Sequence, residues 1–138
     1  AATPNLCVDV PFMATGIGLY SSGVLTAKEV DTFWNYYIST PDDRNTPYTH
    51  GLLGELEGLP PYYIGVGECD VLSEQNLAMA GKLLASGVSV DVKLYRGAPH
   101  SFIEAVAVSS TARQALEDGA QFLRRVFGLG AARVAAVP

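Results

Sequence analysis

The apolar positions of this chain follow two periods, and each period predicts a type of element. Residues 88–95 alternate valine or leucine with mostly polar side chains, which predicts a strand with one buried face. Residues 62–67 form a short apolar run after two prolines, which predicts a buried strand. The two glycines of that run indicate that another backbone packs close to it.

Two segments before and between these strands have helical spacing. The first begins at Thr26, because Thr26 and Glu29 have the spacing of a capping box, and it should stop before Pro41. The second follows the first predicted strand; Ser73 is its expected N-cap and Gly87 should close it.

A third helix is expected from Ser109 or Ser110 to about residue 127, and glycines should end it. Residues 13–24, 39–51 and 96–102 are rich in turn-forming residues and are predicted to be loops, and residues 128–138 a tail. The residues of the third helix that should face inward are Ala112, Ala115, Leu116, Gly119, Phe122, Leu123 and Val126.

Strand and helix therefore alternate, which predicts an α/β fold with mostly parallel strands and covering helices. Of the 138 residues, 49% are apolar and 17% are charged, so the chain can build a core within one domain. A mean hydropathy of +0.20 is on the apolar side, which indicates a surface that another segment or chain covers. We expect an open sheet edge that needs a partner.

The net charge and the length of the apolar runs make nucleic-acid binding and a membrane span unexpected. A net charge of −5 repels phosphate backbones, so nucleic-acid binding is not expected. No apolar run approaches the roughly 20 residues that cross a bilayer, and the first residues lack the basic region of a signal peptide. A cytoplasmic location is the resulting expectation. Cys7 and Cys69 fit neither a disulfide framework nor a zinc signature, and reduced buried thiols are expected.

Two polar residues follow the two predicted strands. Asp70 comes after the first and His100 after the second, and the carboxyl ends of parallel strands meet at one edge of a sheet. A carboxylate beside an imidazole fixes the histidine tautomer and stabilises its cation during general base catalysis. Asp70 and His100 are therefore the candidate catalytic residues, whereas His50 lies in a polar loop and is expected to be a surface residue.

The segment from Leu59 to Phe102 resembles the hormone-sensitive-lipase-like esterases. It has an L-P-P strand leader, a D-x-L motif at residues 70–72, an A-x-G-V turn at residues 85–88 and an H-x-F motif at residues 100–102. Phe33 and Trp34 of the first predicted helix and the segment DDRNTPY (residues 42–48) also resemble family members, so the similarity covers most of residues 6–127. It implies an α/β-hydrolase fold without a cofactor or metal, in which Asp70 orients His100 and His100 is the general base. Ser101 departs from the family, which usually has glycine there.

The chain lacks the G-x-S-x-G nucleophile motif and the H-G-G oxyanion-loop motif of that family. Ser21 and Ser22 have the wrong spacing and no preceding strand. In the family both motifs lie on the N-terminal side of all that resembles it here. The expectation is therefore a chain that starts after the serine.

Three functions remain open. The first is the C-terminal part of a carboxylic-ester hydrolase, completed by an N-terminal portion or separate chain that carries G-x-S-x-G. The second is a non-catalytic, hydrolase-derived module that self-associates as a homo-oligomer or binds a partner. The third is the same scaffold used for acyl transfer or elimination, which the fold alone does not exclude.

Overall fold

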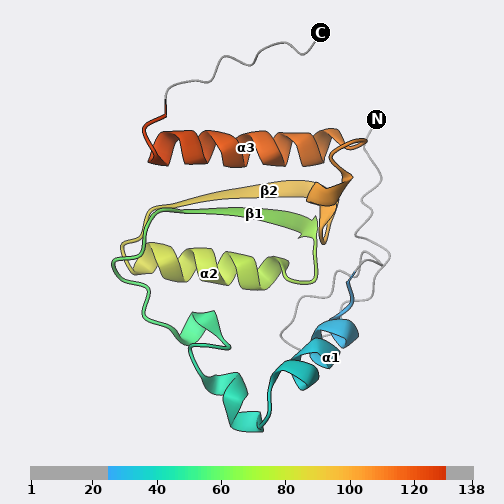
Figure 1. Cartoon of the computed structure of the whole chain (residues 1–138), viewed down its shortest axis with the longest axis vertical. Helices are drawn as coiled ribbons and strands as arrows, with labels where there is room; N and C mark the ends of the chain where they lie inside the picture. Colours follow the sequence, from blue (N-terminus) through green and yellow to red (C-terminus); the bar gives the residue numbers. More distant parts are fainter. Residues whose placement is uncertain (1–24, 130–138) are drawn as a thin grey trace.

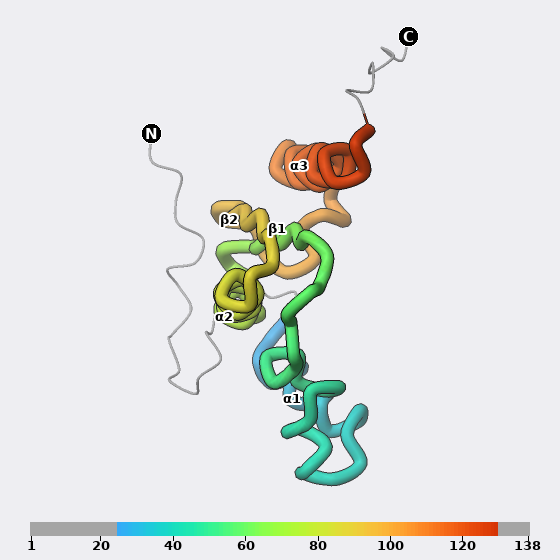
Figure 2. Tube along the Cα trace, turned by 90° about the vertical axis from the view of Figure 1, so that its left-hand side faces the viewer, coloured from blue at the N-terminus to red at the C-terminus, as the bar shows by residue number. Residues whose placement is uncertain are grey.

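The computed structural model describes residues 25–129, and two parallel strands form its centre. Helix α2 covers one face of this sheet and helix α3 the other (Figure 1), and a view turned by 90° keeps them on opposite sides (Figure 2). The predicted α/β class with parallel strands is confirmed. The elements are α1 (Ala27–Tyr37), η1 (Pro41–Asn45), η2 (Gly51–Leu53), β1 (Tyr62–Cys69), α2 (Ser73–Ala85), β2 (Val90–Pro99), η3 (Phe102–Ala105) and α3 (Ser110–Val126).

The loop expected over residues 13–24, and the part of the expected tail beyond residue 129, lie outside the described residues. Within them, no helix is long and apolar enough to cross a membrane. Cys69 is buried as expected, but it is disulfide-bonded, so the expectation of a reduced thiol is wrong at this position.

The helices begin where local hydrogen bonds replace the missing backbone partners of the first turn. Thr26 accepts a bond from the Glu29 N–H (3.2 Å) and Glu29 accepts one from the Thr26 N–H (2.8 Å), which confirms the capping box. Ser109 caps α3. The expectation for α2 is wrong by one residue, because Leu72 rather than Ser73 holds the N-cap position.

The strands pair in register from Tyr62 opposite Val90 to Gly67 opposite Tyr95, and the next pair is Cys69 opposite Pro99. One residue of β1 therefore lies opposite three residues of β2, a bulge at residues 96–98. The sequence predicted a loop from residue 96, which is wrong, because the bulged strand continues to Pro99.

The core has one cluster on each face of the sheet. Leu56, Leu83 and Val88 are buried together on the α2 side, and Tyr95, Ala98 and Ala115 on the α3 side. These residues hold the strands between the two helices, with the carboxyl ends of both strands at one edge.

Part of the predicted core is exposed. Val92 and Leu94 were expected on a buried strand face but are 39% and 47% exposed, and Leu116 and Leu123 of α3 are 47% and 51% exposed. The described sheet has only two strands, which is too narrow to cover the full apolar width of its helices. The expected open sheet edge is thus present in the described part of the chain.

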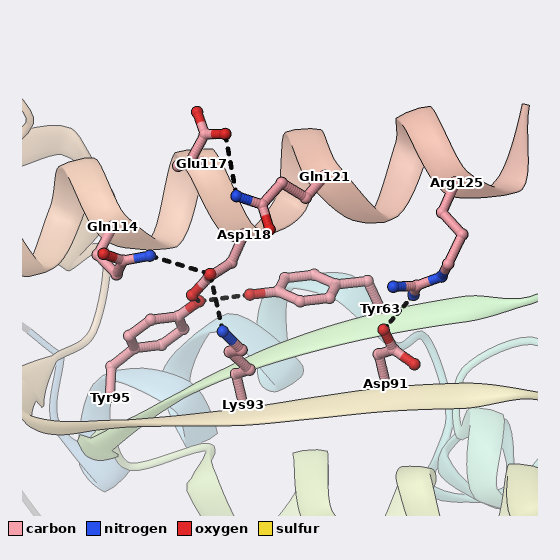
Figure 3. A network of polar contacts seen from close by, with 9 residues as sticks. All are labelled: Tyr63, Asp91, Lys93, Tyr95, Gln114, Glu117, Asp118, Gln121 and Arg125. Carbon is pink, nitrogen blue, oxygen red and sulfur yellow. Dashed lines mark hydrogen bonds and ion pairs between the residues drawn. The ribbon is translucent and has the colours of Figure 1, made fainter. Parts of the chain in front are cut away.

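A buried carboxylate fastens α3 to the sheet (Figure 3). Asp118 is 7% exposed and receives hydrogen bonds from Lys93 Nζ (2.7 Å), Tyr95 Oη (2.9 Å) and Gln114 Nε2 (3.0 Å). Tyr63 completes the network through the hydroxyl of Tyr95. The helical pattern gave no signal for this cluster, since an acidic residue interrupts the apolar face of α3.

This network makes stability sensitive to acid. The hydrogen bond from Lys93 holds the pKa of Asp118 below its ordinary value of 3.8, and Tyr95 and Gln114 act in the same direction. A lowered folded-state pKa gives stability that is present above the unfolded-state pKa and lost as the pH falls through the folded-state pKa. Urea unfolding should therefore show the largest gap between the parent and Asp118→Asn at neutral pH, shrinking below pH 3.8. A gap between the parent and Asp118→Asn that does not change with pH would contradict this.

Candidate active site

Asp70 and His100 meet at the carboxyl edge of the sheet, as the sequence predicted. Asp70 directly follows β1 and His100 directly follows β2. His100 Nδ1 lies 3.0 Å from Asp70 Oδ2 and 3.2 Å from Oδ1. The Asp70 side chain is 12% exposed and that of His100 is 30% exposed, so the pair is largely shielded while the imidazole still reaches the surface.

The carboxylate of Asp70 is fixed by the turn that starts α2. Its Oδ1 accepts the Leu72 N–H (2.9 Å), and its backbone carbonyl accepts the Ser73 N–H (3.0 Å). A carboxylate bonded to Nδ1 of a neutral imidazole keeps the proton on Nδ1. Nε2 is then the atom that can accept a proton from a nucleophile, which is the role of a general base.

The backbone after His100 makes a sharp turn. Ser101 has φ 55° and ψ 19° and is the non-glycine residue of the described chain with a positive φ. This left-handed conformation disfavours side chains with a Cβ atom, so glycine, the residue that the family resemblance implies at this position, would adopt it without strain. The departure at Ser101 changes the energy of the turn and leaves the Asp70–His100 contact in place.

Ser101→Gly should therefore stabilise the chain, by about 1 kcal/mol, through relief of the left-handed strain. Urea unfolding followed by circular dichroism measures this as a higher midpoint with an unchanged slope. Ser101→Ala keeps a Cβ atom and is the matched control, expected at the parent midpoint. A glycine variant no more stable than the alanine variant would show that the turn is not strained.

An open groove of about 740 Å³ leads to His100. Its wall is the apolar face of α1, which lies on the α2 side of the sheet, near the end at which both strands terminate (Figure 1). Phe33 and Tyr37 of this face are 59% and 71% exposed, and the rings of Trp34 and Tyr37 lie 6.1 Å apart. The lining residues are Leu25, Val30, Phe33, Trp34, Tyr36, Tyr37, Leu72, Gln75 and His100.

The helical period of α1 predicted this apolar face but not its position beside His100. Tyr36 and Tyr37 line the groove and are 84% and 71% exposed. Only the tertiary arrangement could reveal the groove, because more than 60 residues separate α1 from His100. His50 is exposed, as predicted.

The described residues of the site can orient an imidazole and accept a proton. The chain holds no G-x-S-x-G nucleophile. Within residues 25–129, no group of three or more His, Cys, Asp or Glu side chains is arranged to hold a metal.

Comparison with known proteins shows the family of this chain. Residues 13–104 match the family described as alpha/beta hydrolase fold. The chain belongs to this family. The match lies inside residues 6–127, where the residues themselves resemble the hormone-sensitive-lipase-like esterases, and that resemblance is confirmed.

Similar solved structures are esterases of the alpha/beta hydrolase fold. An esterase from Pyrobaculum calidifontis is 27% identical with a TM-score of 0.72, over 75% of this chain and 33% of that one. A thermostable carboxylesterase from a metagenomic library is 26% identical (TM-score 0.72, 75% and 35%), and an esterase from Pseudomonas putida is 28% identical (TM-score 0.67, 72% and 33%). The chain thus spans about a third of the length of these esterases.

Proposed function

We propose that this chain is the C-terminal part of a carboxylic-ester hydrolase, in which Asp70 and His100 are the acid and base of a Ser-His-Asp triad. The observation that carries the proposal is the hydrogen bond between His100 Nδ1 and Asp70 at two consecutive strand ends, beside an open groove. The serine and the oxyanion hole would come from an N-terminal portion or a separate chain. The order Ser, Asp, His is that of alpha/beta hydrolases.

In this proposal His100 Nε2 takes the proton of the serine hydroxyl as the oxygen attacks the ester carbonyl. The tetrahedral intermediate collapses to an acyl-serine, and the proton passes from His100 to the departing alkoxide. Water then attacks the acyl-serine with His100 again as the base, which releases the acid and restores the serine. Asp70 keeps the imidazole in the required tautomer throughout.

The groove supports a substrate with an apolar group. Its aromatic lining from α1 offers a large apolar surface, and Gln75 is the polar side chain that lines it together with His100. Apolar walls with few polar groups are typical of sites for small organic molecules. We therefore propose a small-molecule ester, and no metal or organic cofactor takes part in these steps.

Fluorophosphonate labelling of the native protein tests the proposal. The protein is isolated from its source through an affinity tag on this chain, labelled, and read by intact-mass spectrometry. Labelling of a serine on the same polypeptide or on a co-purifying chain, abolished by His100→Ala, is the expected result. A single unlabelled mass, equal to the 14.6 kDa chain plus its tag, in a homo-oligomer would instead support the self-associating module, for which the exposure of Val92 and Leu94 is the specific observation.

A further inference from the structure

We propose that Glu68 is a positioning residue for the Asp70–His100 pair, because its carboxylate holds the bulge of β2 that precedes His100. The catalytic meaning of this inference rests on the proposed function, whereas the geometry it describes does not. Glu68 belongs to β1 and lies two residues before Asp70, and the bulge at residues 96–98 ends two residues before His100.

The contact is made to the backbone of the bulge. Glu68 Oε2 accepts the N–H of Gly97 (2.8 Å), and Oε1 accepts a bond from Arg96 Nη1 (3.1 Å). The Glu68 side chain is 25% exposed, while that of Arg96 is 83% exposed. The backbone bond is therefore the better shielded of the two, and the ion pair with Arg96 is open to solvent screening.

The bulge needs such a partner because its extra residues leave the regular ladder. Gly97 has φ 68°, a left-handed conformation that glycine adopts without strain. An N–H removed from the ladder needs another acceptor. The side chain of Glu68, directly opposite the bulge, is that acceptor.

The strands approach closely at the same point. A Cβ atom on Gly67 would lie 2.8 Å from the carbonyl oxygen of Ala98 and 3.1 Å from that of Pro99. The missing side chain of Gly67 and the carboxylate of Glu68 thus fix the path of β2 just before His100. If the carboxylate is removed, the bulge can shift its extra residues and carry His100 away from Asp70. A hydrogen bond of 3.0 Å tolerates little such movement.

The test reads the His100 tautomer in the isotope-labelled 138-residue chain. Long-range proton–nitrogen correlation spectra at mildly alkaline pH give the chemical shifts of both ring nitrogens, and His50→Ala assigns the two histidines. The parent should show only the Nδ1–H tautomer at His100. Glu68→Ala should show a mixture of both tautomers, because the imidazole has lost its fixed contact with Asp70.

Two further variants separate positioning from a general loss of structure. Glu68→Gln keeps an oxygen that can accept the Gly97 N–H and should restore the parent shifts, and Arg96→Ala should leave them unchanged. Parent shifts in Glu68→Ala, or a tautomer mixture in Arg96→Ala equal to that in Glu68→Ala, would overturn the inference. If Glu68→Ala does not fold, Glu68→Asp is measured instead, because its side chain is too short to accept the N–H of Gly97. Parent chemical shifts of His100 in Glu68→Asp would contradict the proposal.

The two proposals can fail separately. A single Nδ1–H tautomer that depends on Glu68, in a protein without a fluorophosphonate-reactive serine, would refute the hydrolase and leave the positioning role standing. A labelled serine, together with His100 chemical shifts that do not change when Glu68 is substituted, would support the hydrolase and refute the positioning role of Glu68.

Discussion

Asp70→Asn is expected to lower kcat for a p-nitrophenyl ester by roughly 10³- to 10⁴-fold in the hydrolase completed by its serine-bearing portion, with little change in KM. An asparagine amide can donate a hydrogen bond to Nδ1, which places the imidazole proton on Nε2. In that tautomer His100 cannot accept the proton of a serine hydroxyl. The substitution therefore removes general base catalysis while preserving the size and the turn contacts of the side chain.

Steady-state kinetics with a burst of p-nitrophenol measure this effect, because the burst separates acylation from deacylation. Asp42→Asn removes the same charge from an exposed position of η1 and is the matched control, expected to retain parent activity. His100→Ala should be at least as damaging as Asp70→Asn. An Asp70→Asn enzyme within tenfold of the parent would exclude Asp70 as the acid of the triad.

The order of elements and the pairing of Asp70 with His100 could both be predicted from the sequence for one physical reason. Period-two and helical patterns indicated two strands separated by one helix, and a parallel pair must bring the residues after both strands to the same edge. At this edge His100 Nδ1 lies 3.0 Å from Asp70 Oδ2. Its catalytic role stays a prediction, since geometry alone does not establish a reaction.

The bulge and the groove could not be predicted because both depend on contacts between distant residues. Gly97 and Pro99 looked like loop residues, yet they continue β2 around a bulge that Glu68 stabilises from the opposite strand. Likewise, the helical spacing of α1 predicts an apolar face, but the place of this face beside His100 depends on how residues 38–61 return the chain to the sheet. Local pattern indicates which residues are apolar, and tertiary packing decides which of them are covered.

Asp118 is a polar residue whose burial likewise depends on tertiary contacts that the local sequence pattern does not show. A helical wheel places it among the apolar positions of α3, where an acidic residue looks unfavourable. The structure offsets its burial with Lys93, Tyr95 and Gln114, and two of these partners come from β2. The ring of Tyr95 also packs at a tilt against that of Phe102, with centroids 5.2 Å apart, so the network contacts residues on both sides of the turn that carries His100.

Leu83→Ala should lower the free energy of unfolding of the 138-residue chain by about 3 kcal/mol, the middle of the range for a buried leucine. Leu83 is fully buried between Leu56 and Val88, so truncation removes apolar contacts and leaves a cavity on the α2 face of the sheet. Leu84 is the next residue of the same helix but is 55% exposed. Leu84→Ala is therefore a matched control whose expected loss is below about 0.5 kcal/mol.

Urea titration followed by circular dichroism distinguishes the two variants, with equal slopes expected because both unfold from the same compact state. The α2-side cluster contains only three buried residues within the described chain, so truncation of one of them should change the free energy of unfolding measurably. Equal losses for Leu83→Ala and Leu84→Ala would mean that the face of α2 carrying Leu84 is covered in solution. In that case the partner expected at the open sheet would already be bound in the purified protein, and the unfolding midpoint of Leu84→Ala should rise with protein concentration.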